Sequence, residues 1–131
     1  MFKYTIFCLA MLITLIGIVP AHAEDAIEFE LESLDGEDYS LEGMLEECDL
    51  LVIDFWQVGC KPCNEFLPHL QEYYDKYQED GVEFVIVSRD TSLTLAQVEP
   101  FFAANEYTFR ILLDTDLEMS GDYGVKASPA T

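Results

Sequence analysis

Two cysteines two residues apart, Cys60 and Cys63, are the side chains best suited to chemistry in this chain of 131 residues. Thiols at this spacing can close a structural disulfide, supply half of a metal site, or exchange electrons with another disulfide. They stand in the stretch DFWQVGCKPCNEF, which starts at Asp54 and overlaps the end of a continuous apolar run. The residues around the pair decide between these three kinds of chemistry.

Pro62 predicts that a helix begins at the cysteine motif, because the first helical turn does not need the N–H that proline lacks. Cys60 then lies at the amino end of the helix, where free N–H groups and the helix dipole stabilise a thiolate, and Lys61 adds a cation. We expect the pKa of Cys60 to fall from about 8.5 towards neutrality. Cys63, one turn deeper, should be buried. Cys60 would therefore attack a disulfide, and Cys63 would resolve the mixed disulfide.

Asp54 is the second residue that suggests chemistry, because it interrupts an apolar run that extends from Leu50 to Trp56. Burying a carboxylate is costly and raises its pKa. A buried Asp54 could then accept or donate a proton for Cys63, directly or through water. The alternative is a solvated carboxylate at a frayed strand end.

Hydrophobic periodicity predicts three buried strands with helices between them. The strands span residues 50–55, 82–88 and 109–113. The helices run from the cysteine motif to Gly81, from Thr94 towards Ala104, and from Leu117 to Tyr123. Thr94 and Gln97 have the form of a capping box, whereas Pro100 favours a kink or a later start of that helix.

An N-terminal hairpin is predicted before these strands, because residues 27–31 alternate apolar and acidic side chains and an Asp35-Gly36 turn follows. A short helix from Ser40 or Leu41 to Glu47 comes next. The whole order predicts one α/β domain, with a central, mostly parallel sheet and helices on both faces. Sites in such sheets form at the carboxyl ends of the strands, which is where the cysteine pair stands. Ser88, Arg89 and Asp90 end a neighbouring strand there, either as substrate contacts or as a solvated loop.

Residues 1–23 are interpreted as a cleaved signal peptide, with Lys3, an apolar run over residues 4–19, and Ala21 and Ala23 before the cut. The alternative is a membrane anchor formed by residues 4–19, although this run is short for a bilayer of about 30 Å. The domain would then span residues 24–131. Export predicts a secreted or periplasmic protein, in which disulfides can persist.

Acidic residues dominate the charge: 26 Asp and Glu stand against six Lys and Arg, for a formal net charge of −20. All of the acids follow Ala23. A field of this sign repels phosphate polyanions, so we expect no nucleic-acid partner. The acidic run itself is typical of a solvated face.

A zinc site would need four ligands, and only Cys48 and His69 are available beyond the pair. His69 falls within a predicted helix and is expected to be an ordinary surface or packing residue. A disulfide that closes so short a loop removes little entropy from the unfolded chain, so a staple explains the spacing poorly. We therefore expect a redox pair and no metal or other cofactor. Cys48 is either a small buried apolar side chain or a third redox thiol.

The segment from Val52 to Trp56, the Cys60-Lys61-Pro62-Cys63 motif and Pro68 together resemble the active-site segment of the thioredoxin superfamily. The acidic hairpin, the signal and the stretch 114–116 resemble its TlpA/ResA-like branch of extracytoplasmic thiol–disulfide oxidoreductases. The stretch 123–131 is similar to the family's cis-proline loop. The resemblance spans residues 27–131.

This resemblance implies a thioredoxin-like fold and a redox disulfide between Cys60 and Cys63. It also implies reduction of protein or small-molecule disulfides, with electrons from an upstream membrane or periplasmic thiol reductant. Cytochrome c maturation and envelope redox homeostasis are the roles that the resemblance suggests. Trp56, Ser128 and a cis Pro129 would bind substrate, and Lys61 and Pro62 would tune the thiolate.

The chain departs from the family pattern at Gly59, where a bulky residue is frequent, and at its end. The family continues with two antiparallel strands and a helix after the position of Thr131, so a fragment with these elements missing is expected, in which the strand 50–55 becomes an edge. Two alternatives remain. A peroxiredoxin-like peroxidase shares the fold but usually has Thr where this chain has Gln57, and a non-catalytic interaction module would keep the fold alone.

Overall fold

The computed structural model of the chain describes residues 26–131. The predicted signal peptide and the alternative anchor over residues 4–19 lie outside the described residues. Within the described range, no helix has both the length and the apolar character needed to cross a membrane.

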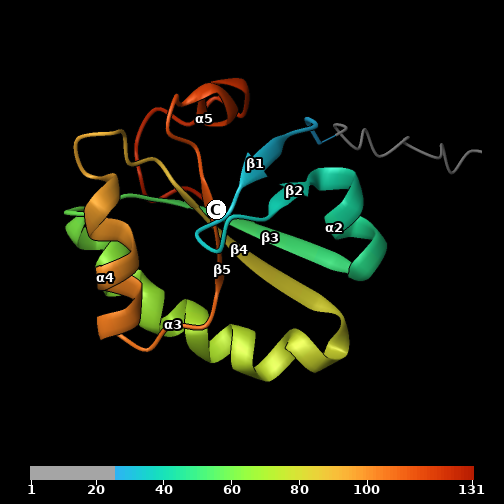
Figure 1. Cartoon of the computed structure of the whole chain (residues 1–131). Helices are drawn as coiled ribbons and strands as arrows, with labels where there is room; N and C mark the ends of the chain where they lie inside the picture. The colour runs from blue at the N-terminus through green and yellow to red at the C-terminus, as the bar shows by residue number, and fades with distance from the viewer. Residues whose placement is uncertain (1–25) are drawn as a thin grey trace, which may run out of the picture.

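A three-stranded parallel sheet in the order β3-β4-β5 forms the centre of the fold (Figure 1). Its strands are β3 (Leu50–Trp56), β4 (Val82–Ser88) and β5 (Arg110–Leu113). The crossover from β3 to β4 runs through α3 (Lys61–Tyr77) and the 3-10 turn η1 (Gln78–Asp80), and that from β4 to β5 through η2 (Leu95–Gln97) and α4 (Val98–Ala104). The predicted parallel α/β class is confirmed, and β3 lies at one edge of this three-stranded sheet.

The predicted hairpin consists of β1 (Glu30–Glu32) and β2 (Asp38–Ser40), which pair antiparallel. Helix α2 (Leu41–Glu47) follows directly, and the Ser40 hydroxyl caps it by accepting a hydrogen bond from the Gly43 amide at 3.2 Å. The hairpin is attached to β5, because the Leu34 amide donates to the Ile111 carbonyl at 3.1 Å.

Two hydrophobic clusters lie on opposite faces of the sheet, as expected for helices on both sides. Helices α3 and α4 cover one face, while the hairpin, α2 and α5 (Glu118–Asp122) cover the other. Side chains alternate between the faces along a strand. On β3, Val52 and Trp56 belong to the α3 face and Phe55 to the opposite one. Asp54 therefore points to the face covered by α3, which carries Cys63.

The helix predicted from Thr94 begins later than its capping box suggests. Thr94 makes no side-chain cap hydrogen bond, residues 95–97 form η2, and α4 starts only at Val98. This start puts Pro100 in the first turn of α4, where its missing N–H costs no helical hydrogen bond. The backbone restriction at proline thus overrides the capping pattern.

Candidate active site

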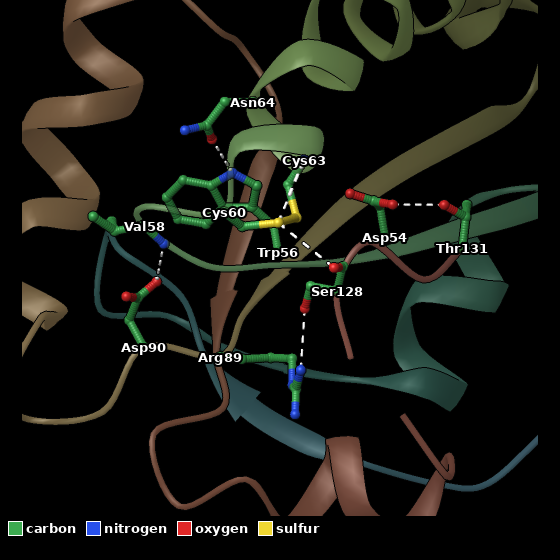
Figure 2. The surroundings of a disulfide bond; sticks show 10 residues. All are labelled: Asp54, Trp56, Val58, Cys60, Cys63, Asn64, Arg89, Asp90, Ser128 and Thr131. Atoms are coloured by element: carbon green, nitrogen blue, oxygen red, sulfur yellow. Dashed lines mark hydrogen bonds between the residues drawn. A yellow bond between two sulfur atoms is a disulfide. The ribbon is translucent and has the colours of Figure 1, made fainter. Parts of the chain in front are cut away.

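The cysteine pair lies just beyond the carboxyl end of β3, where Cys60 and Cys63 form a disulfide with an S–S distance of 2.01 Å (Figure 2). Cys63 is buried, with 1% of its surface exposed, whereas Cys60 is half-buried. A partner molecule can therefore approach Cys60 more readily than Cys63. This difference in access is the one that a nucleophile and a resolving thiol need.

Cys60 is the N-cap residue of α3, and its Sγ accepts a hydrogen bond from the Cys63 amide at 3.3 Å. Pro62 occupies the first turn, as predicted. In the reduced protein the same N–H and the amino end of this 17-residue helix would stabilise a thiolate on Cys60. The Lys61 side chain is 86% exposed and forms an ion pair with Glu65 at 3.7 Å. Solvent and Glu65 therefore weaken its effect on the thiolate.

Asp54 is buried, as predicted, with 1% of its surface exposed. One carboxyl oxygen, Oδ1, accepts a hydrogen bond from the Thr131 hydroxyl at 2.6 Å, and the buried Oδ2 has no hydrogen-bond partner. Burial raises the pKa of Asp54, and the hydrogen bond from Thr131 opposes this shift in part. In Figure 2 the carboxyl group lies between Thr131 and the disulfide, with the unpaired oxygen on the Cys63 side.

The loop 125–130 lies beside the disulfide, next to Cys60. Its Ser128–Pro129 peptide bond is cis, and the Ser128 carbonyl oxygen lies 3.6 Å from Cys60 Sγ. The loop is attached to β3, because the Phe55 amide donates to the Ala130 carbonyl at 2.8 Å. Ser128 thus presents its backbone to the cysteine that a substrate would reach first.

Trp56 has no exposed surface, so its ring is not available to a substrate in this structure. The ring packs against Phe101 and Phe102, with centroid distances of 5.0 and 4.9 Å, and its Nε1 donates to Asn64 Oδ1 at 2.8 Å. The expectation that Trp56 binds substrate is therefore corrected: the side chain joins β3 to α3 and α4 beneath the cysteine pair.

Asp90 is a buried site residue whose role the sequence left open. Its Oδ2 accepts hydrogen bonds from the Val58 amide at 2.9 Å and from the Ser88 hydroxyl at 3.0 Å. Asp90 is 2% exposed, so the solvated-loop alternative is wrong for this residue. These two hydrogen bonds hold the turn before Cys60 against the end of β4. The sequence indicated only that Asp90 belongs to a polar run after a buried strand, and such a run does not show that Asp90 binds the Val58 amide.

Asp90→Ala is expected to lower the free energy of unfolding by about 1–3 kcal/mol, because the buried Val58 amide and Ser88 hydroxyl lose their acceptor. Urea denaturation followed by circular dichroism measures this change. Asp75→Ala is the matched control, since Asp75 is exposed and accepts only from Gln71. We expect that control to stay within about 0.5 kcal/mol of wild type. Equal losses in both variants would contradict the assignment.

Cys48 does not join the cysteine pair. It stands before the first residue of β3, at the end of that strand opposite Cys60, and its thiol donates to the Met44 carbonyl at 3.2 Å. Burial raises the pKa of this thiol. His69 is on the surface, with a side chain 66% exposed. Among residues 26–131, no three or more His, Cys, Asp or Glu residues are grouped so that they could hold a metal ion.

Comparison with known proteins gives one family match, to the AhpC/TSA family over residues 23–131. The chain is 33% identical over 109 residues to the thiol-disulfide oxidoreductase ResA of Halalkalibacterium halodurans, a match that covers 82% of this chain and 59% of the relative. It is also 33% identical over 104 residues to the sporulation thiol-disulfide oxidoreductase A of Bacillus subtilis, with 79% and 61% covered. The chain thus spans about three fifths of the length of these relatives.

Solved structures with a similar fold include StoA from Bacillus subtilis, with a TM-score of 0.62 and 30% identity over 79% of this chain and 75% of that one. The thioredoxin domain of a thiol-disulfide oxidoreductase from Bacteroides vulgatus superposes with a TM-score of 0.70 at 20% identity, covering 81% and 75%. At that identity the second likeness concerns the fold alone. The predicted thioredoxin-like fold is confirmed.

Proposed function

Because the chain belongs to the AhpC/TSA family, we propose that it is a thiol–disulfide oxidoreductase that reduces protein disulfides through Cys60 and Cys63. One observation carries this proposal: an accessible cysteine caps α3, bonded to a buried partner, with the Ser128 carbonyl 3.6 Å away. The names of the relatives point to the same class of reaction.

The reaction uses the reduced pair. The Cys60 thiolate attacks one sulfur of the substrate disulfide, so that an S–S bond to Cys60 forms, the substrate's own S–S bond breaks, and its other sulfur leaves as a thiolate that takes up a proton. Asp54 accepts the proton of Cys63, and the resulting thiolate attacks Cys60 Sγ. The Cys60–Cys63 bond forms, the bond between Cys60 and the substrate breaks, and the substrate sulfur leaves as a thiolate that takes up a proton from Asp54 or solvent. The substrate leaves as a dithiol, and two electrons have passed to it from the pair. A thiol reductant returns Cys60 and Cys63 to the reduced form.

We also propose where the reaction takes place and what supplies its electrons. Residues 1–23 would direct the chain out of the cytoplasm, and a membrane or periplasmic thiol would supply electrons. Cytochrome c maturation and envelope redox homeostasis are the roles that the resemblance to the TlpA/ResA-like branch suggests. The substrates would be protein or small-molecule disulfides.

Insulin reduction with dithiothreitol as electron donor tests the proposed reaction. The full chain is expected to speed precipitation of the insulin B chain in proportion to its concentration. Hydrogen peroxide consumption with the same donor tests the peroxidase alternative, and we expect no acceleration there. Peroxide turnover without insulin reduction would favour the peroxidase, and neither activity would favour the non-catalytic module.

A further inference from the structure

Arg89, directly after β4, hydrogen-bonds to the substrate-facing loop at Val125 and Ser128. We propose that Arg89 is a positioning residue for disulfide reduction, whose guanidinium holds the loop 125–128 so that the Ser128 backbone faces Cys60. This assignment rests on the proposed function, because the loop matters only if a disulfide-bearing substrate docks on it.

Three donor groups of one side chain reach three parts of this region. Arg89 Nε donates to the Ser120 hydroxyl at 3.1 Å, one terminal nitrogen donates to the Ser128 hydroxyl at 3.1 Å, and the other to the Val125 carbonyl at 3.3 Å. The residue is itself placed by the sheet, since it directly follows β4 and its amide donates to the carbonyl of Trp56, the last residue of β3, at 2.8 Å. Only a forked guanidinium can make these contacts together.

The contact to Ser120 connects Arg89 to the buried carboxylate of Asp114. The Ser120 hydroxyl donates to the carboxylate of Asp114, which is fully buried at the end of β5 and also accepts from the Ser120 amide at 2.8 Å. Because Arg89 donates to the Ser120 oxygen, the single hydroxyl proton of Ser120 is free for Asp114. The guanidinium is thus held by a serine that a buried carboxylate orients, and it is not a freely moving surface cation.

The contact to Ser128 explains how Arg89 could act on the reaction. In Figure 2 the Ser128 hydroxyl points to Arg89, whereas the Ser128 carbonyl points to Cys60. The hydrogen bond from Arg89 to the Ser128 hydroxyl therefore holds Ser128 in place, and the Ser128 backbone is free to contact a substrate. Loss of Arg89 would release Ser128 and Val125 together without touching either cysteine.

Arg89→Ala is expected to raise KM for insulin about tenfold, the size expected when charged hydrogen bonds that orient a binding loop are lost. Reduction of 5,5′-dithiobis(2-nitrobenzoate), a small disulfide without peptide backbone, should change less than about twofold. The pH profile of Cys60 alkylation by iodoacetamide should stay the same. Arg89→Lys keeps the charge but not the fork, so it should restore little of the KM.

Arg110→Ala is the matched control, since Arg110 is also half-buried but pairs with Glu83 and covers Tyr39, contacts unconnected to the loop. It should leave KM for insulin unchanged. Hydrogen exchange should quicken in residues 123–130 of Arg89→Ala and not of Arg110→Ala. In a double-mutant cycle, Arg89→Ala should cost less in a Ser128→Ala background.

Four results would overturn the assignment. An unchanged KM in Arg89→Ala means that the loop does not need the guanidinium. An equal rise in Arg110→Ala means that general loosening is the cause. Full recovery of KM in Arg89→Lys, with an altered alkylation profile in Arg89→Ala, means that the positive charge of residue 89 acts on the Cys60 thiolate and that the loop contacts are not the cause. Wild-type protein that reduces neither disulfide overturns the proposed function, and this assignment with it.

Discussion

Cys60→Ser is expected to reduce insulin reduction to the rate of dithiothreitol alone, a loss of at least about a thousandfold, because a serine hydroxyl cannot replace a thiolate as nucleophile. Cys63→Ser is expected to behave differently. Cys60 still attacks in that variant, but no second thiol resolves the product, so a mixed disulfide between Cys60 and the substrate should accumulate. Non-reducing electrophoresis and mass spectrometry of the trapped species measure both outcomes.

Cys48→Ser is the control for these two variants, because Cys48 lies at the opposite end of β3 from the pair. It should keep the wild-type rate and form no mixed disulfide. Insulin reduction that survives Cys60→Ser would show that another thiol is the nucleophile. A mixed disulfide trapped on Cys63 in Cys60→Ser, with turnover retained, would reverse the proposed roles even though Cys63 is buried.

Much of the fold could be predicted because it depends on local patterns. The apolar run over residues 82–88 is the whole of β4, and the expected start of a helix at the cysteine motif agrees with α3. Proline and glycine mark boundaries through backbone restrictions that act within a few residues. Gly81, for example, has a φ of 82° where the chain turns from η1 into β4.

The hydrogen-bond partners that the sequence could not identify lie in distant parts of the chain. Arg89 and Ser128 are 39 residues apart, and Val58 and Asp90 are 32 apart. Such pairs meet only when the sheet brings strand ends together, and no periodicity within one segment reports them. Trp56 was misassigned for the same reason, since Phe101 and Phe102, which cover its ring, belong to α4, which follows β3 only after α3 and β4.

Asp54→Asn is expected to slow resolution of the mixed disulfide about a hundredfold at neutral pH, because an amide cannot take the proton of Cys63. The step can be isolated by trapping the wild-type and variant proteins as Cys60 mixed disulfides and following release of the substrate thiol. The initial attack by Cys60 should be little affected, since Asp54 lies on the Cys63 side of the disulfide (Figure 2).

The same substitution is expected to stabilise the protein at pH 8. Burial raises the pKa of Asp54 above its ordinary value of 3.8, so the folded state holds this proton more tightly than the unfolded state. The free energy of unfolding therefore falls as pH rises from about 3.8 through the raised pKa, and the ionised carboxylate destabilises the fold above it. Asp54→Asn removes this charge, and we expect a gain of about 1–2 kcal/mol at pH 8 that disappears near pH 3.

Urea denaturation at both pH values separates this effect from ordinary changes in charge. Asp49→Asn is the matched control, because Asp49 is exposed just before β3 and should change stability by less than about 0.5 kcal/mol at either pH. A slow resolving step together with a stability gain only at high pH would identify Asp54 as a proton acceptor kept at a cost to the fold. If resolution and stability both stay at wild-type values, the buried carboxylate has neither role, and Cys63 must lose its proton to solvent.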